Sequence, residues 1–214
     1  MQDKNTYKLL TPGPLTTTAT VKDAMQVDLC TWDDDYKQMT QDIHQSLLKL
    51  AHADNGGYTT VLMQGSGTFG VETSYDKVPD AAAIDQALTE HPEVTHVSMV
   101  HSETTTGILN DIATVGTVAK KHGVQFIVDA MSTFGGVDID VPALGITCII
   151  SSANKCIQGV PGFSFIIAKK ENLANTKGTA RSLALDLFAQ WDTIERKIAF
   201  YVTNPCCRCL LRGY

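Results

Sequence analysis

Apolar residues form two kinds of pattern along the chain. Short apolar runs bounded by polar turns predict buried strands, and apolar residues recurring every three or four positions predict amphipathic helices. Strands are expected at Tyr58–Met63, Val94–Val100, Val124–Asp129, Ile146–Ile150 and Phe163–Ala168. Helices are expected near Val21 and over Asp33–His52, Ala81–Thr89 and Asp111–His122. Because the two patterns alternate, the sequence predicts an α/β fold with a mostly parallel sheet and helices on both faces.

Polar or glycine-rich residues stand at or just beyond the ends of several expected strands. They are Gly65–Thr68, Glu103–Thr106, Asp129 and Lys155. In parallel sheets, ligands bind at the carboxyl ends of the strands, where these residues would meet. The pattern therefore predicts a ligand site at this edge of the sheet.

The segment Gln64–Gly70 has the composition of a phosphate cradle. Backbone N–H groups at the start of a helix bind an anion, and Ser66 and Thr68, on either side of Gly67, add hydroxyl donors. The segment lacks the lysine of a Walker loop and the complete dinucleotide fingerprint. A tight turn between a strand and a helix, without a ligand, is the alternative interpretation.

Lys155 lies among small and polar residues in Ser151–Gly162, between two expected strands. Partial burial there would disfavour the ammonium form and make the amine a nucleophile, as a Schiff-base lysine requires. An ordinary surface lysine is the alternative, and for Asp129 the alternative is a helix cap or loop acid. A cradle, an acid and a lysine together are the parts of a pyridoxal-phosphate site.

The charge and the apolar content of the chain argue against some classes of binding partner. The net charge of −6 and the pI near 5.4 argue against nucleic acid and against an anionic membrane surface. No apolar run is long enough to span a bilayer, and Met1–Asn5 lacks the apolar core of a signal peptide. The chain is therefore expected to be cytoplasmic, with small-molecule substrates.

The 6 cysteines do not form a metal-binding pattern. Single, scattered cysteines in a cytoplasmic chain are usually reduced. Cys206, Cys207 and Cys209 crowd the end of the chain, but they lack the two-residue spacer and distant partner pair of a zinc site. No metal is expected.

Several motifs resemble the 2-aminoethylphosphonate–pyruvate transaminases, which are fold-type I aminotransferases close to the alanine–glyoxylate enzymes. The motifs that carry the resemblance are Leu10–Leu15, Gln64–Thr68, His101–Gly107, Val128–Ser132 and Ser152–Gly162. The first and last are the most specific. The match runs from residue 5 to about residue 196, with one interruption.

The resemblance implies roles for individual residues. Lys155 would be the Schiff-base lysine and Asp129 the partner of the pyridinium nitrogen. The phosphate would be held by Ser66, Gly67 and Thr68 with help from Asn154, and Thr104 would lie near the ring and its phenolic oxygen. Thr11, Pro12 and Gly13 would lie beside the substrate. Members of the family convert 2-aminoethylphosphonate and pyruvate to phosphonoacetaldehyde and alanine in phosphonate catabolism, and they work as homodimers.

The chain departs from this family in three places. Ser102 stands where the family has Cys, which is a small change. Near residues 73 and 74 a long segment of the family is absent, including an aromatic residue that stacks on the cofactor. The tail resembles a frameshifted version of the family's sequence, which would explain the terminal cysteines. We therefore expect an N-terminal arm at 1–20, an incomplete cofactor-binding large domain at 21–196 and an aberrant tail at 197–214, without the small domain.

Three functions fit these observations. The first is transamination of 2-aminoethylphosphonate with pyruvate, and we expect it to be impaired by the missing segments. The second is a non-catalytic remnant of such an enzyme. The third keeps pyridoxal phosphate but uses alanine and glyoxylate as substrates.

Overall fold

A computed structural model describes residues 9, 15–26, 33–64, 80–182 and 185–197. Within these residues the chain forms one sheet in the order β1-β5-β4-β3-β2. The strands are β1 (Tyr58–Gln64), β2 (His96–Val100), β3 (Gln125–Asp129), β4 (Cys148–Ser152) and β5 (Phe163–Lys169). The helices are α1 (Ala19–Ala24), α2 (Asp34–Leu50), α3 (Ala81–Glu90), α4 (Ile112–His122), α5 (Lys170–Ala174) and α6 (Leu187–Lys197).

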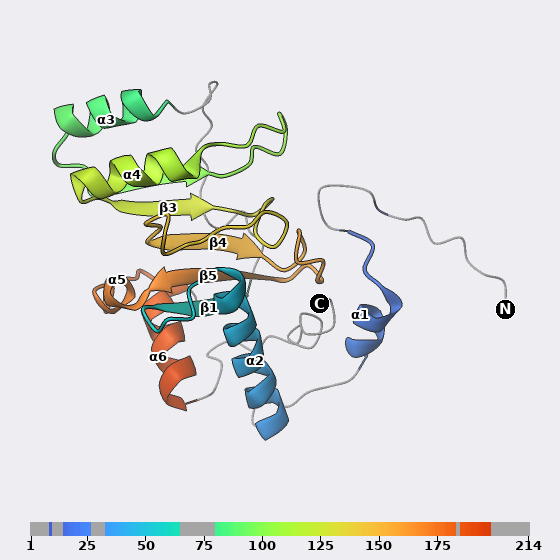
Figure 1. The fold of residues 1–214 in the computed structure, drawn as a ribbon. Coiled ribbons are helices and arrows are strands. Elements are labelled where there is room, and N and C mark those ends of the chain that lie inside the picture. Colours follow the sequence, from blue (N-terminus) through green and yellow to red (C-terminus); the bar gives the residue numbers. More distant parts are fainter. Residues whose placement is uncertain (1–8, 10–14, 27–32, 65–79, 183–184, 198–214) are drawn as a thin grey trace.

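The α/β fold expected from the sequence is confirmed, and its sheet is mixed. Strands β2, β3 and β4 are parallel neighbours, whereas β5 runs antiparallel to both β4 and β1. Strand β1 therefore runs in the same direction as β4, and β5 is the one reversed strand of this sheet (Figure 1). As a result, β1, β2, β3 and β4 all end at the same edge of the sheet.

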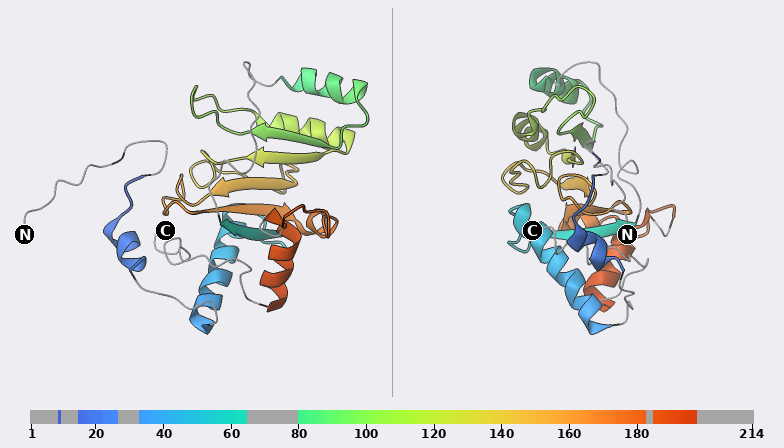
Figure 2. Two further views of the ribbon diagram at one scale, coloured as in Figure 1. Left: turned by 180° about the vertical axis from the view of Figure 1, so that it is seen from behind. Right: turned by 90° about the vertical axis from the view of Figure 1, so that its right-hand side faces the viewer.

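The main core lies on the sheet face that carries Val128 of β3 and Ile149 of β4. Helix α2 adds Ile43 and Leu47 to this core, as its helical spacing predicts, and α4 adds Val115. Helices α2 and α6 lie side by side next to β1, and α3 and α4 lie toward the opposite end of the sheet (Figures 1 and 2).

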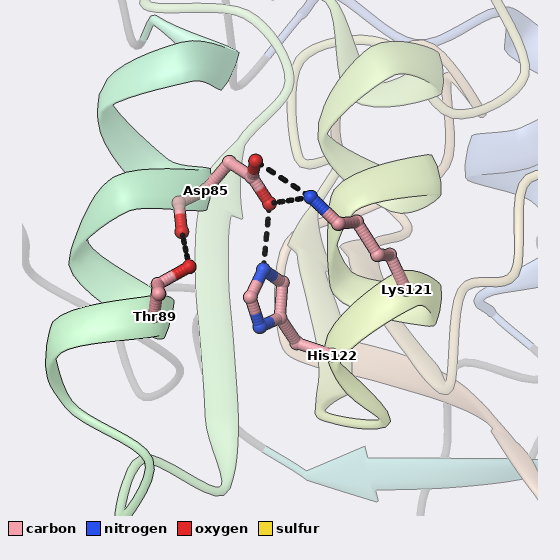
Figure 3. Close-up of polar contacts among 4 residues, drawn as sticks. All are labelled: Asp85, Thr89, Lys121 and His122. Carbon is pink, nitrogen blue, oxygen red and sulfur yellow. Dashed lines mark hydrogen bonds and ion pairs between the residues drawn. The ribbon is translucent and has the colours of Figure 1, made fainter.

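Helix α3 is tied to α4 by a cluster of charged side chains. The Asp85 carboxylate accepts hydrogen bonds from Lys121 Nζ at 2.7 and 2.8 Å, and His122 Nε2 lies 2.6 Å from Asp85 Oδ1 (Figure 3). Hydrogen bonds from Lys121 and His122 lower the pKa of Asp85. Because α3 and α4 precede and follow β2, the cluster connects the two helices that flank this edge strand in sequence.

Acid is expected to weaken the packing around His44 of α2, which is only 6% exposed. Burial lowers the pKa of His44 to about 4, while Glu195 raises it and Lys170 lowers it. The unfolded chain takes up a proton near pH 6.5 and the folded chain does not, so stability falls as the pH drops from 6.5 toward 4. A shift of this size corresponds to about 3 kcal/mol of unfolding free energy.

Urea denaturation at pH 7.5 and pH 4.5 measures this loss. His44→Leu replaces the titrating ring with an apolar side chain of similar size. The free energy of unfolding of this variant should therefore fall less between the two pH values than that of the unsubstituted protein. An equal fall in both proteins would contradict the assignment to His44.

Candidate functional site

Asp129 is the last residue of β3, and Lys155 lies in the turn that follows the neighbouring strand β4. Both side chains are half-buried. Burial raises the pKa of Asp129, the backbone N–H of Met131 lowers it, nearby Glu103 raises it and Lys155 lowers it. Glu103 and Lys155 thus act electrostatically on Asp129. Asp129 ends β3, whereas Glu103 and Lys155 lie in the loops that follow the neighbouring strands β2 and β4.

The turn that carries Lys155 is held by backbone hydrogen bonds. Gln158 N–H donates to the Lys155 carbonyl at 2.8 Å, and Gly159 N–H donates to the Ala153 carbonyl at 2.7 Å. A Cβ on Gly159 would lie 3.0 Å from that Ala153 carbonyl, so a side chain there would crowd the turn. Val160, farther along the same segment, packs against Val21 of α1. The position of Lys155 is therefore fixed by its own loop, with α1 against its far end.

Hydroxyl groups connect the loops that follow β2 and β3. Thr104 Oγ1 and Ser132 Oγ lie 2.9 Å apart. The Ser132 carbonyl accepts a hydrogen bond from the Cys156 thiol at 3.3 Å, and Cys156 directly follows Lys155. Ser132 is not among the site residues predicted from the sequence, although its contacts join two segments that were predicted to meet.

A buried hydroxyl at the same edge has no partner among the described residues. It belongs to Ser152, the last residue of β4, which is 1% exposed. Asp129 pairs with Ile150, and side chains two residues apart on a strand share a face, so Ser152 and Asp129 lie on one face of the sheet. An unpartnered buried hydroxyl is costly unless a further polar group bonds to it.

The structure places only part of the predicted site. It brings Asp129, Lys155, Asn154 and Thr104 to the carboxyl edge of the sheet, with Asn154 half-buried in the lysine turn and Thr104 exposed. The other predicted site residues, namely Thr11, Pro12, Gly13, Ser66, Gly67 and Thr68, lie outside the described residues, as does the junction near 73 and 74.

Among the described residues, the structure has neither a membrane-spanning helix nor a metal-binding cluster. None of their helices combines the length and apolar character that a membrane crossing requires. No group of three or more His, Cys, Asp or Glu side chains in this part of the chain could hold a metal ion. Cys148 and Cys156 are free thiols, and the terminal cysteines lie beyond the described part.

Sequence comparisons match the chain to a protein family and to curated relatives. The family model for aminotransferase class-V matches residues 68–184. The chain is 46% identical to the 2-aminoethylphosphonate–pyruvate transaminase of Lactiplantibacillus plantarum over 91% of its length and 64% of the relative's. It is 48% identical to the enzyme of that name from Klebsiella pneumoniae, over 88% of the chain and 62% of the relative. The chain thus spans somewhat less than two thirds of these curated relatives.

Solved structures share the fold. The alanine–glyoxylate aminotransferase from Nostoc sp. superposes with a TM-score of 0.81 at 18% identity, over 100% of this chain and 69% of that one. The pyridoxamine–pyruvate aminotransferase from Mesorhizobium loti superposes with a TM-score of 0.79 at 19% identity, over 98% of this chain and 64% of that one. At these identities the likeness concerns the fold alone.

Proposed function

Since the chain belongs to the class-V aminotransferases, whose family model matches more than half of it, we propose that it binds pyridoxal 5′-phosphate and serves transamination. The observation that carries this proposal is the placement of Asp129 and Lys155 at one edge of the sheet, at the end of β3 and just after its neighbour β4. The curated relatives named as 2-aminoethylphosphonate–pyruvate transaminases indicate the substrates. The amino group would move from 2-aminoethylphosphonate to pyruvate, giving phosphonoacetaldehyde and alanine.

The described residues fit this cofactor. Asp129 offers a half-buried carboxylate whose pKa is raised mainly by burial. A protonated pyridine nitrogen beside it would favour the ionised form. The Ser152 hydroxyl has no partner among the described residues, so a further polar group beside it would be favourable. When bound, pyridoxal phosphate supplies an electron-accepting ring that stabilises negative charge on the substrate carbon.

The family resemblance, together with side-chain chemistry, gives roles to the chain's own residues. The Lys155 amine would bond to the cofactor aldehyde and then carry the proton at the amine-bearing carbon of the substrate. Thr104 would donate a hydrogen bond to the phenolic oxygen, and Ser66, Gly67 and Thr68, assisted by Asn154, would hold the phosphate. Thr11, Pro12 and Gly13 would lie beside the substrate. The chain would work in the cytoplasm as a homodimer.

An internal deletion near residues 73 and 74 remains part of the proposal. Its support is the alignment with the Lactiplantibacillus plantarum relative, which covers 235 residues although the whole chain has 214. If the deletion removes a group that stacks on the cofactor ring, cofactor binding and activity will be weak. The second candidate function is therefore a remnant that binds the cofactor poorly and does not turn over.

An assay of the purified full chain tests the proposal. With added pyridoxal phosphate, 2-aminoethylphosphonate and pyruvate should yield alanine, and a visible absorbance band should show cofactor bonded to the protein. Glycine, serine or alanine with glyoxylate tests the alternative substrates. Cofactor absorbance without alanine formation would favour the remnant. The absence of both the absorbance band and alanine formation would refute the proposed function.

A further inference from the structure

Ser132 contacts two loops on either side of its own. Its hydroxyl lies 2.9 Å from Thr104 Oγ1 in the loop after β2, and its carbonyl accepts from the Cys156 thiol beside Lys155. The contact with Cys156 is close-packed, because a Cβ on Gly136 would lie only 2.9 Å from the Cys156 sulfur. The loop after β3 is therefore fixed against the lysine turn, and the Ser132 hydroxyl joins Thr104 to it.

We propose that Ser132 is a positioning residue that orients the Thr104 hydroxyl toward the phenolic oxygen of the cofactor. The inference rests on the proposed function. Only one proton can lie between the two hydroxyl oxygens. If Ser132 donates it, the Thr104 proton is free to point at a ligand oxygen. Hydrogen bonds in series strengthen one another, so the Ser132 bond also makes Thr104 a better donor.

The neighbouring threonine hydroxyl is used differently. Thr105 Oγ1 donates to Glu103 Oε1 at 3.2 Å, so its proton is already committed within its own loop. Among these two threonines, Thr104 is the one whose hydroxyl is paired with a neighbouring loop. The contrast fits the ligand contact that the family resemblance implies for Thr104, and it leaves Ser132 as the residue that would orient this hydroxyl.

Loss of the Ser132 hydroxyl should change the spectrum of the bound cofactor. A well-directed donor stabilises the negative phenolic oxygen, and without Ser132 the Thr104 hydroxyl can rotate away. In Ser132→Ala we expect the pH midpoint of the visible absorbance change to rise by about 0.5 unit. The dissociation constant of pyridoxal phosphate should rise about threefold. Asp129, Glu103 and Lys155 are unchanged in the variant. So are the Cys156 thiol on the Ser132 carbonyl and His101, whose Nδ1 lies 2.9 Å from Thr133 Oγ1.

The experiment compares Ser132→Ala with Ser132→Thr and Ser46→Ala. Ser132→Thr keeps the hydroxyl and should restore the midpoint. Ser46→Ala removes an exposed hydroxyl that bonds only locally to the Asp42 carbonyl on α2, and it should change nothing. Equal midpoints in Ser132→Ala and the unsubstituted chain would overturn the inference and leave the proposed function intact. No cofactor absorbance in the unsubstituted chain would overturn both.

Discussion

Lys155→Ala should lose both the visible absorbance of bound cofactor and transamination. The amine of Lys155 is the group that would bond to the cofactor aldehyde and carry the substrate proton, and no other residue of its turn has a side-chain amine. Proton transfer by a positioned group alone contributes about 10²–10⁴-fold. Because the covalent step is lost as well, we expect the rate of alanine formation to fall by at least about 10⁴-fold.

A matched lysine variant separates this loss from a general effect of charge. Lys120→Ala removes an exposed lysine from α4, far from the carboxyl edge in sequence and structure, and it should retain absorbance and rate. Far-ultraviolet circular dichroism should match in both variants. Persistence of the absorbance band in Lys155→Ala would show that another amine binds the cofactor.

Asp129→Asn should impair function while making the cofactor-free protein more stable. Asparagine cannot hold a proton on the pyridine nitrogen, so we expect the rate of alanine formation to fall about 10²–10⁴-fold, as for loss of a positioned ionisable group. Asparagine keeps the Oδ1 acceptor for the Met131 N–H. It removes a carboxylate whose ionised form is disfavoured by burial.

The pH dependence of stability tests this prediction independently. A raised pKa means that the folded chain holds its proton more tightly than the unfolded chain. Ionisation of Asp129 therefore costs stability increasingly as the pH rises above the ordinary value of 3.8. Asp129→Asn should melt at a higher temperature than the unsubstituted, cofactor-free protein at pH 7, and the difference should vanish below pH 3.8. Asp54→Asn, at an exposed loop position, serves as the control. A lower melting temperature for Asp129→Asn at pH 7 would contradict the assigned cost.

The hydrophobic pattern predicted most helices and strands because each helix buries one apolar face and each buried strand is a short apolar run. Helix α2 is the clearest example, since its buried Ile43 and Leu47 and its exposed Lys49 follow the helical spacing. The pattern failed at the start of β2, where the Val94 N–H bonds to the His91 carbonyl in a turn. It also missed α5 and α6.

The reversed direction of β5 could not be predicted from apolar residues, because a buried strand has the same composition in either direction. The connection from β4 to β5 spans residues 153–162, which is shorter than a parallel crossover with its helix requires. The short connection between β4 and β5 was thus the sequence feature that indicates the reversed direction of β5. Asp129 and Lys155 could be placed at this edge from the sequence because Asp129 ends a recognisable strand and Lys155 follows one, and their roles stay predictions. The role of Ser132 could not be predicted from the sequence, because its hydrogen bond to Thr104 joins side chains 28 residues apart in sequence.

The placement of β5 between β1 and β4 also determines when the chain can fold during synthesis. Strand β1 pairs with β5, which follows it by about a hundred residues, so its ladder cannot form until β5 has left the ribosome. At ordinary rates of translation this delay lasts about 5–20 s. Throughout it, the edges of β1 and the apolar face of α2 are available to chaperones and to other nascent chains. Production of this protein should therefore depend on translation speed and on chaperone supply.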